Sequence, residues 1–238
     1  MNIAIIIAGG TGQRMEKEIP KQFLHVEDKP VIIYTLEAFQ KHPDIDEIGV
    51  VCIVGWHEML SAYARQFQIT KLKWIVNGGS CGQESIYNGL QEAQKRYDKK
   101  DLILIHDAIR PMVSQDIITD CIIQCRKYGS AISAVPCTTA VLEYADAEKT
   151  ITRNEIDRNK LAMTQTPQAF PLETLVWAHE EAAKRGITQS VASCTLLAEL
   201  GKELYFSLGS ETNIKLTTQA DLEIFKALLH VKNRENRG

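Results

Sequence analysis

The sequence predicts an α/β protein in which helices cover both faces of a mostly parallel sheet. The first observation is Ile3–Ile7, an unbroken apolar run rich in β-branched residues, which is typical of a strand buried on both faces. The second is Ile48–Val54, which has the same character and follows an amphipathic segment. The third is the alternation of strand-like and helix-like segments along the chain, with no internal repeat. At 238 residues, the chain suits one domain spanning 1–238.

The remaining elements follow in order. Apolar residues recur at helical spacing in seven segments, which predicts helices at Val31–Phe39, Met59–Phe67, Ser85–Tyr97, Asp116–Tyr128, Leu172–Lys184, Ser193–Glu199 and Gln219–Val231. Shorter apolar runs predict further strands at Leu72–Val76, Asp101–Ile105, Ala131–Val135 and Leu204–Leu208. Ser114 is the predicted cap of the helix after it, Thr166–Gln168 is predicted to turn the chain back, and the charged tail Lys232–Arg237 is predicted to fray.

One long segment departs from this alternation. From Cys137 to Met163, charged and polar residues are interleaved with short apolar ones such as Val141-Leu142 and Ile156, and no helical stripe is visible. We therefore predict an arm of short strands that projects from the main sheet.

Composition argues against several classes of protein. The net charge of −3 does not suit a nucleic-acid-binding surface, which usually needs a basic face. No apolar run approaches the ~20 residues that span a bilayer, and Asn2–Ile7 lacks the features of a signal peptide, so we expect a cytoplasmic protein without membrane contact. The six cysteines are scattered without a CxxC pair, which indicates neither a zinc site nor a disulfide framework.

A glycine-rich loop, Gly9-Gly10-Thr11-Gly12, follows the first strand. Glycines let backbone N–H groups approach an anionic ligand, and Arg14 and Lys21 add positive charge nearby. The pattern is neither a P-loop nor the dinucleotide-binding fingerprint. A tight turn with two solvated charges is the alternative interpretation. The cations behind the glycines favour a nucleoside triphosphate site at the end of the first strand.

Polar residues also follow the strand Asp101–Ile105, at an edge of the sheet where open α/β proteins bind their ligands. Asp107 is the candidate magnesium ligand, because magnesium takes one or two carboxylates together with phosphate oxygens and water. The alternative is that Asp107 caps a turn or pairs with Arg110. We interpret His106 as a hydrogen-bonded structural residue rather than a ligand.

Five motifs, in order and at familiar spacing, carry a resemblance to a known family. They are Ala8–Met15 with Pro20–Gln22, Gly78–Ser85, His106–Pro111, Gln165–Gln168 and Asn213–Thr217. With these motifs the chain resembles the CTP-dependent cytidylyltransferases that act on methylerythritol phosphate or ribitol 5-phosphate, over nearly its whole length. The segment Gly209–Asn213 favours the ribitol phosphate members.

The resemblance implies a Rossmann-like nucleotidyltransferase fold whose arm, about Thr138–Ala162, interlocks with a partner subunit in a homodimer. It implies CTP as substrate, Mg²⁺ held by Asp107, and Arg14, Lys21 and Lys215 as catalytic cations. The residues that it implies for nucleotide binding are Ala8, Gly9, Gly10, Thr11, Gly12, Gly79, Ser80, Ser85, Asp107 and Ala108. Those that it implies for acceptor binding are Arg110, Thr139 and Arg158.

The implied reaction is attack by an acceptor phosphate oxygen on the α-phosphorus of CTP, with release of pyrophosphate. The chain departs from the family pattern at the acceptor end. Gly82 stands where an arginine is usual, Thr139-Ala140 where Asp-Thr is usual, and Ala192-Ser193 where an acidic residue is expected. The alternatives are therefore an atypical acceptor or a nucleotide-binding paralogue that has lost catalysis.

Overall fold

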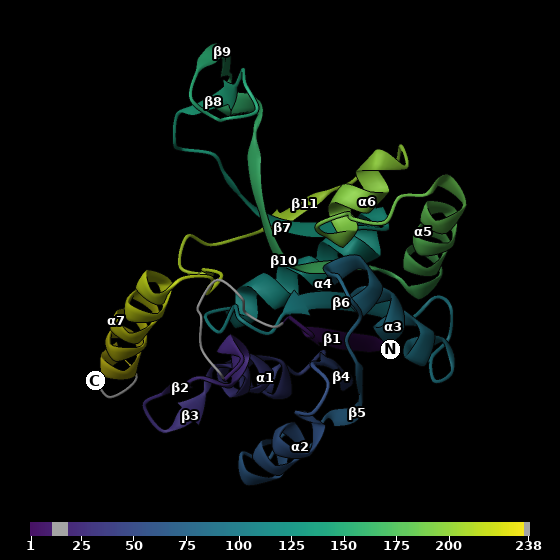
Figure 1. Ribbon diagram of the computed structural model, residues 1–238. Helices are drawn as coiled ribbons and strands as arrows, with labels where there is room; N and C mark the ends of the chain where they lie inside the picture. Colours follow the sequence, from purple (N-terminus) through teal and green to yellow (C-terminus); the bar gives the residue numbers. More distant parts are fainter. Residues whose placement is uncertain (11–18, 236–238) are drawn as a thin grey trace.

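The computed structural model describes residues 1–10 and 19–235 and is built on a seven-stranded sheet with the order β11-β7-β10-β6-β1-β4-β5 (Figure 1). The strands are β1 (Asn2–Ala8), β4 (Glu47–Cys52), β5 (Leu72–Asn77), β6 (Leu102–Asp107), β7 (Ala131–Pro136), β10 (Ala162–Pro171) and β11 (Phe206–Leu208). Strand β10 runs antiparallel to β6 and β7, and the other neighbours are parallel. The predicted α/β fold with a mostly parallel sheet is confirmed.

Helices form a layer on each face of this sheet (Figure 1). One core joins the sheet to α1 (Val31–Lys41), α2 (His57–Gln66) and α4 (Gln115–Tyr128). The other joins it to α3 (Gly82–Gln94), α5 (Leu172–Arg185) and α6 (Ser193–Glu199). The C-terminal helix α7 (Gln219–Glu235) packs on a third, smaller cluster that includes Leu216 and Phe225.

Strand β1 lies at the centre of both main cores. Ala4 and Ile6 enter the core under α1 and α4, whereas Ile3 and Ile5 enter the core under α3 and α5. All four side chains are fully buried. This explains the unbroken apolar run, because a strand with a core on each face has no side that prefers polar residues.

The predicted arm is present. Strands β8 (Val141–Tyr144) and β9 (Thr152–Ile156) pair as an antiparallel ribbon that projects from the sheet (Figure 1). Leu142 and Tyr144 on this ribbon are 57% and 62% exposed, although both have large hydrophobic side chains. The role of the arm in a homodimer stays a prediction.

The predicted turn at Thr166–Gln168 is wrong. These residues lie inside β10, which continues to Pro171. The β10–β7 register shifts between Thr164 and Gln168, and the Thr166–Pro167 peptide bond is cis. Proline cannot donate a ladder hydrogen bond, so an interior strand accepts it where the pairing is interrupted.

Several boundaries also differ from the prediction. Helix α3 begins at Gly82 rather than Ser85, because the Cys81 sulfur accepts a hydrogen bond from the Glu84 N–H and caps the helix one turn earlier. Helix α7 continues through Lys232 to Glu235, so the predicted fraying does not begin at Lys232.

Elements too short to show periodicity were missed, namely the turn η2 (Lys21–Phe23) and the hairpin of β2 (His25–Val26) and β3 (Lys29–Pro30). The Ser114 cap is confirmed, since its side chain accepts from the Ile117 N–H.

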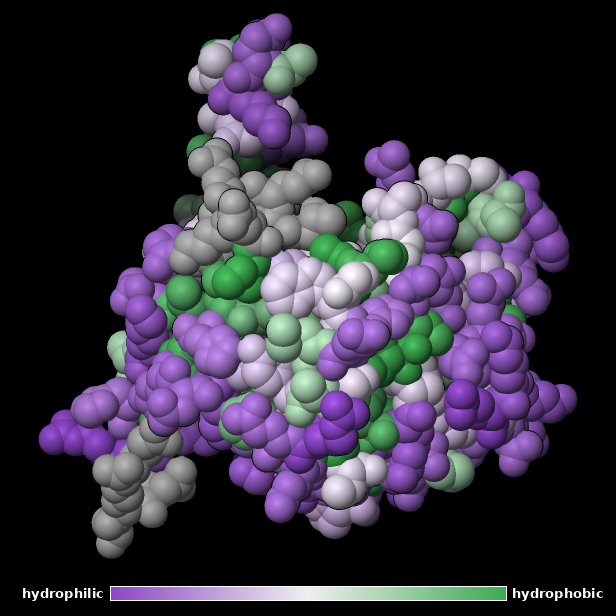
Figure 2. All heavy atoms as spheres, turned by 60° about the horizontal axis from the view of Figure 1, so that its bottom comes forward, coloured by the Kyte–Doolittle hydropathy of each residue, from purple (hydrophilic) through white to green (hydrophobic). Residues whose placement is uncertain are grey.

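Hydrophilic side chains cover most of the face shown in Figure 2, and hydrophobic ones form small separate areas. Within the described residues, the structure has no helix that is long and apolar enough to cross a membrane.

His179 on α5 provides a test of the core between α3 and α5. The residue is 6% exposed, and its imidazole stacks on Tyr87 at 5.3 Å between ring centroids and has no hydrogen-bond partner for Nε2 among the described residues. Burial lowers its pKa from 6.5 to about 4. The unfolded state therefore binds a proton on His179 more readily than the folded state does. As a result, the contribution of His179 to the free energy of unfolding falls as pH drops from 6.5 towards 4.

We expect His179→Phe, which keeps an aromatic ring against Tyr87, to weaken this pH dependence. The measurement is the melting temperature of wild type and variant between pH 7.5 and 5. The difference in melting temperature between the two pH values is expected to be smaller in the variant. An equal difference in both proteins would contradict the assignment.

Candidate active site

A pocket of about 280 Å³ lies where the carboxyl ends of β1 and β6 meet the loop between β5 and α3. Ten residues predicted for nucleotide binding or catalysis line it, namely Ala8, Gly9, Gly10, Lys21, Gly79, Ser80, Ser85, Asp107, Ala108 and Lys215. Thr11, Gly12 and Arg14 lie outside the residues that the structure describes. The fold thus brings together groups from both ends of the chain at the edge expected for ligand binding.

Gly9 and Gly78 bring the two loops of this pocket into backbone contact. A Cβ at Gly78 would lie 2.9 Å from the Cα of Gly9, and a Cβ at Gly9 would lie 3.0 Å from the Ser85 hydroxyl. Real Cβ atoms essentially never lie under 3.0 Å from backbone, so a substitution at Gly78 requires the loops to separate, whereas one at Gly9 requires a small shift of Ser85. Loop packing is therefore a second reason for glycine here, beside access for a ligand.

Ser85 holds the second loop in place. Its Oγ accepts from the Gly79 N–H at 3.0 Å and donates to the Cys81 carbonyl at 2.9 Å. The Glu84 carboxylate accepts hydrogen bonds from the N–H and the hydroxyl of Ser80, which lower the pKa of Glu84. These contacts shape the wall of the pocket on which we predict the nucleotide to rest.

Gln22 is a site residue whose role the sequence analysis missed. Its side chain is buried, and Nε2 donates to the carbonyl of Ala8 at 2.7 Å and to that of Gly10 at 3.1 Å. The amide therefore fixes the beginning of the glycine loop against η2, which also carries Lys21. The signal available in the sequence is an amide side chain placed directly between Lys21 and the apolar Phe23.

Asp107 at the end of β6 forms ion pairs with two basic side chains. Lys215 Nζ and Arg110 Nε each lie 3.1 Å from its Oδ2. Burial by itself would raise the pKa of Asp107, but Lys215 and Arg110 outweigh it and hold the pKa below its ordinary value. The carboxylate is therefore ionised at neutral pH, and the pairing with Arg110 considered above is present.

A magnesium ion would have one carboxylate available among the described residues that line this pocket, that of Asp107. Arg110 Nε and Lys215 Nζ both contact Oδ2 of this carboxylate. Groups of three or more His, Cys, Asp or Glu side chains able to enclose a metal do not occur among residues 1–10 and 19–235. Magnesium accepts a single carboxylate when phosphate oxygens and water complete its coordination, so Asp107 is the described residue that would hold it.

His106 is fully buried and acts as a structural hydrogen-bonding residue, as predicted. Its Nδ1 lies 3.1 Å from the Thr166 hydroxyl, and its Nε2 lies 3.2 Å from the Arg110 carbonyl. Burial lowers its pKa to about 4 despite the neighbouring Asp107 carboxylate, so the ring is neutral. The Thr166 hydroxyl in turn accepts from the Asp107 N–H at 3.0 Å. This network fixes the backbone on both sides of the carboxylate.

The residues predicted to bind the acceptor are not gathered in this pocket. The Arg110 side chain is 11% exposed and spans from Asp107 to the carbonyl of Asn213, to which Nη1 donates at 2.7 Å. Thr139 and Arg158 lie where the arm joins the sheet, and Arg158 donates to the Thr138 carbonyl at 2.7 Å. Neither Thr139 nor Arg158 lines the pocket of its own chain.

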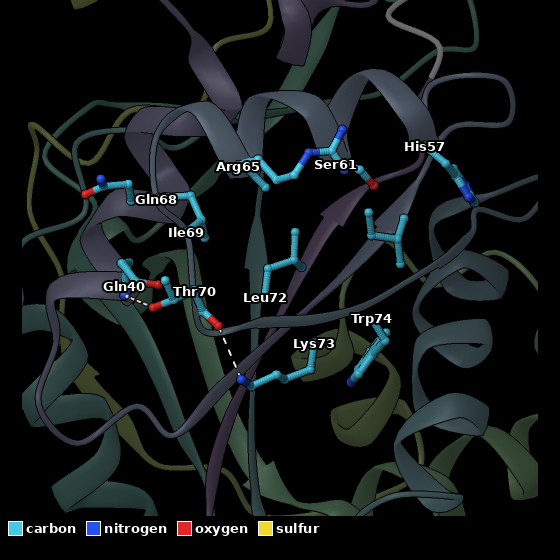
Figure 3. A pocket seen from close by; sticks show the side chains of 12 residues that line it. Gln40, His57, Ser61, Arg65, Gln68, Ile69, Thr70, Leu72, Lys73 and Trp74 are labelled. Atoms are coloured by element: carbon cyan, nitrogen blue, oxygen red, sulfur yellow. Dashed lines mark hydrogen bonds between the residues drawn. The ribbon is translucent and has the colours of Figure 1, made fainter.

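A larger pocket of about 970 Å³ lies at the sheet edge, between α2 and β5 (Figure 3). Arg65 extends from the helix above it, and Lys73 and Trp74 extend from the strand below (Figure 3). Size alone favours such a pocket as a binding site. The described residues that line it, however, include neither a carboxylate nor a glycine loop. The convergent charges and backbone amides occur at the smaller pocket, which we take as the candidate active site.

Solved structures share this fold. A 4-diphosphocytidyl-2C-methyl-D-erythritol synthase from Anaerococcus prevotii matches with a TM-score of 0.80 and 24% identity, over 96% of each chain. The 2-C-methyl-D-erythritol 4-phosphate cytidylyltransferase of Francisella tularensis matches with a TM-score of 0.75 and 27% identity, over 94% of this chain and 97% of that one. Fold and site together define an α/β nucleotidyltransferase.

Sequence comparison identifies the family. The family model described as IspD, 2-C-methyl-D-erythritol 4-phosphate cytidylyltransferase, matches residues 2–231. The ribitol-5-phosphate cytidylyltransferase of Lacticaseibacillus paracasei is 45% identical over 98% of this chain and 99% of that protein. The 2-C-methyl-D-erythritol 4-phosphate cytidylyltransferase of Clostridium botulinum is 37% identical over 96% and 97%. The chain therefore belongs to the IspD family of cytidylyltransferases, which confirms the resemblance found in the motifs.

The contact between Gly9 and Gly78 leads to a prediction for CTP binding. Gly78→Ala must separate the loops, so we expect the dissociation constant for CTP, measured by calorimetry, to rise about tenfold, or ~1.4 kcal/mol. Gly82→Ala is the matched control, because a Cβ there meets nothing within 4 Å. Equal CTP affinities in the two variants would show that the loop contact does not shape the nucleotide pocket.

Proposed function

We propose that this protein transfers CMP from CTP to ribitol 5-phosphate and releases pyrophosphate. The observation that carries the proposal is full-length similarity to proteins named ribitol-5-phosphate cytidylyltransferase, at 45% identity in Lacticaseibacillus paracasei and 38% in Vibrio parahaemolyticus. The pocket supports it with two glycine loops and the cations Lys21 and Lys215 on its wall.

The chemistry suits this set of residues. The nucleophile is a phosphate oxygen that is already anionic, so the reaction needs alignment and charge stabilisation more than a general base. Backbone N–H groups of the glycine loop bind the triphosphate. Lys21 and Lys215 stabilise the negative charge that develops on the reacting phosphates. Asp107 holds Lys215 in place through the 3.1 Å ion pair.

Magnesium, a homodimer and a cytoplasmic location complete the proposal. Asp107 would hold the magnesium ion, which when bound neutralises phosphate charge. Thr139 and Arg158 would bind the acceptor phosphate in the pocket of the partner subunit, because in their own chain they lie at the base of the arm and outside the pocket.

We expect pyrophosphate release when the protein is mixed with CTP, magnesium and ribitol 5-phosphate, and slower release with 2-C-methyl-D-erythritol 4-phosphate. An enzyme-coupled pyrophosphate assay with both acceptors measures this. Release with 2-C-methyl-D-erythritol 4-phosphate but not with ribitol 5-phosphate would assign the chain to the 2-C-methyl-D-erythritol 4-phosphate cytidylyltransferases. Release with neither, together with CTP binding by calorimetry, would favour an atypical acceptor or a paralogue that has lost catalysis.

Lys21→Ala should lower kcat/KM about 10²- to 10³-fold, because the loss of one preorganised charge contact to the transition state typically costs that much. Lys95→Ala is the control, since Lys95 pairs with Glu92 on the surface and its side chain is 70% exposed. Steady-state kinetics of both variants with saturating acceptor provide the test. If Lys21→Ala and Lys95→Ala behave alike, Lys21 does not act on the phosphates.

A further inference from the structure

Lys215 reaches the active site from a segment without regular secondary structure. The chain between β11 and α7 contains neither helix nor strand, yet it places the ammonium group 3.1 Å from Asp107. Hydrophobic burial fixes one side of this segment, because Leu216 is 3% exposed and its N–H donates to the Ile109 carbonyl at 2.9 Å. The other side needs a separate anchor.

Asn213 supplies that anchor. Its side chain is fully buried, and Nδ2 donates to the Thr166 carbonyl at 2.9 Å and to Gln165 Oε1 at 3.3 Å. Gln165 also holds the start of the segment, because its Nε2 donates to the Ser210 carbonyl at 2.8 Å and its Oε1 accepts from the Ser210 N–H at 3.2 Å. Two side-chain amides thus attach the segment to β10.

The position of Asn213 is also linked to the carboxylate that Lys215 meets. Arg110 donates through Nη1 to the Asn213 carbonyl at 2.7 Å and through Nε to Asp107 Oδ2 at 3.1 Å. One guanidinium therefore joins the anchor of the segment to the acidic partner of Lys215. A shift of Asn213 would change both ends of the ion pair.

We propose that Asn213 and Gln165 are positioning residues that hold Lys215 against Asp107. The proposal rests on the proposed function, in which Lys215 acts on the phosphates of CTP. Neither amide is a catalytic residue, because Asn213 has no exposed surface and Gln165 does not line the pocket. Their effect on the reaction passes through the placement of the lysine.

Lysine acetylation followed by mass spectrometry tests this placement without requiring turnover. Lys226 is the internal standard, because it pairs with Glu223 and its side chain is 47% exposed, against 44% for Lys215. In Asn213→Ala we expect the acetylation rate of Lys215 relative to Lys226 to rise about fivefold, because the segment that carries it opens locally. We expect kcat to fall about tenfold or more, because the ammonium is no longer aligned.

Two further variants make the test specific. Gln165→Glu keeps an acceptor for Ser210 and Asn213 but puts an oxygen in place of the donor to the Ser210 carbonyl, so we expect the same ratio to rise. Ile45→Val is the control, because Ile45 is buried just before β4, at the end of the strands away from the candidate site. It should lower thermal stability without altering the Lys215 to Lys226 ratio.

An unchanged Lys215 to Lys226 ratio in folded Asn213→Ala overturns the proposal. If that variant does not fold, the same result in folded Gln165→Glu overturns it. If Asn213→Ala raises the ratio but the wild-type protein releases no pyrophosphate with any acceptor, the positioning role stands and the proposed function is removed. The two failures are therefore distinguishable.

Discussion

The burial of β1 on both faces is the constraint on which the rest of the structure depends. Its side chains alternate between two cores, with Ile6 in one and Ile5 in the other. Because both faces are filled, the strand can meet a ligand only at its end. The glycine loop begins at that end, and the neighbouring strands β4 and β6 finish beside it in parallel register.

Electrostatics then define what this edge of the sheet can bind. Asp107 contributes one negative charge and meets two cations, Arg110 and Lys215, so the cluster keeps a net positive charge. Lys21 adds a further cation on the wall of the same pocket. A triphosphate suits such a pocket, because its charge is stabilised by fixed cations and backbone N–H groups rather than by water.

The residues that we propose for nucleotide binding and those that we propose for acceptor binding lie apart in this chain. The predicted nucleotide-binding residues that the structure describes line one pocket, whereas Thr139 and Arg158 lie at the base of the arm. Of the departures from the family pattern, Thr139-Ala140 lies at the base of the arm. Gly82 instead lines the candidate pocket, where a Cβ would meet nothing within 4 Å, and Ala192-Ser193 lies at the beginning of α6.

By itself, the sequence determined the order and type of nearly all long elements, because apolar periodicity directly reflects which face of a helix or strand is buried. It also indicated Lys21, Asp107 and Lys215 through their motifs. Only the tertiary structure decided that Thr166–Gln168 belongs to a strand, that Gln22 fastens the glycine loop, and that Asn213 and Gln165 anchor the segment of Lys215. These contacts join residues far apart in the chain, such as Asn213 to Thr166 and Lys215 to Asp107. A local pattern carries no information about such partners, because the path of the folded chain brings them together.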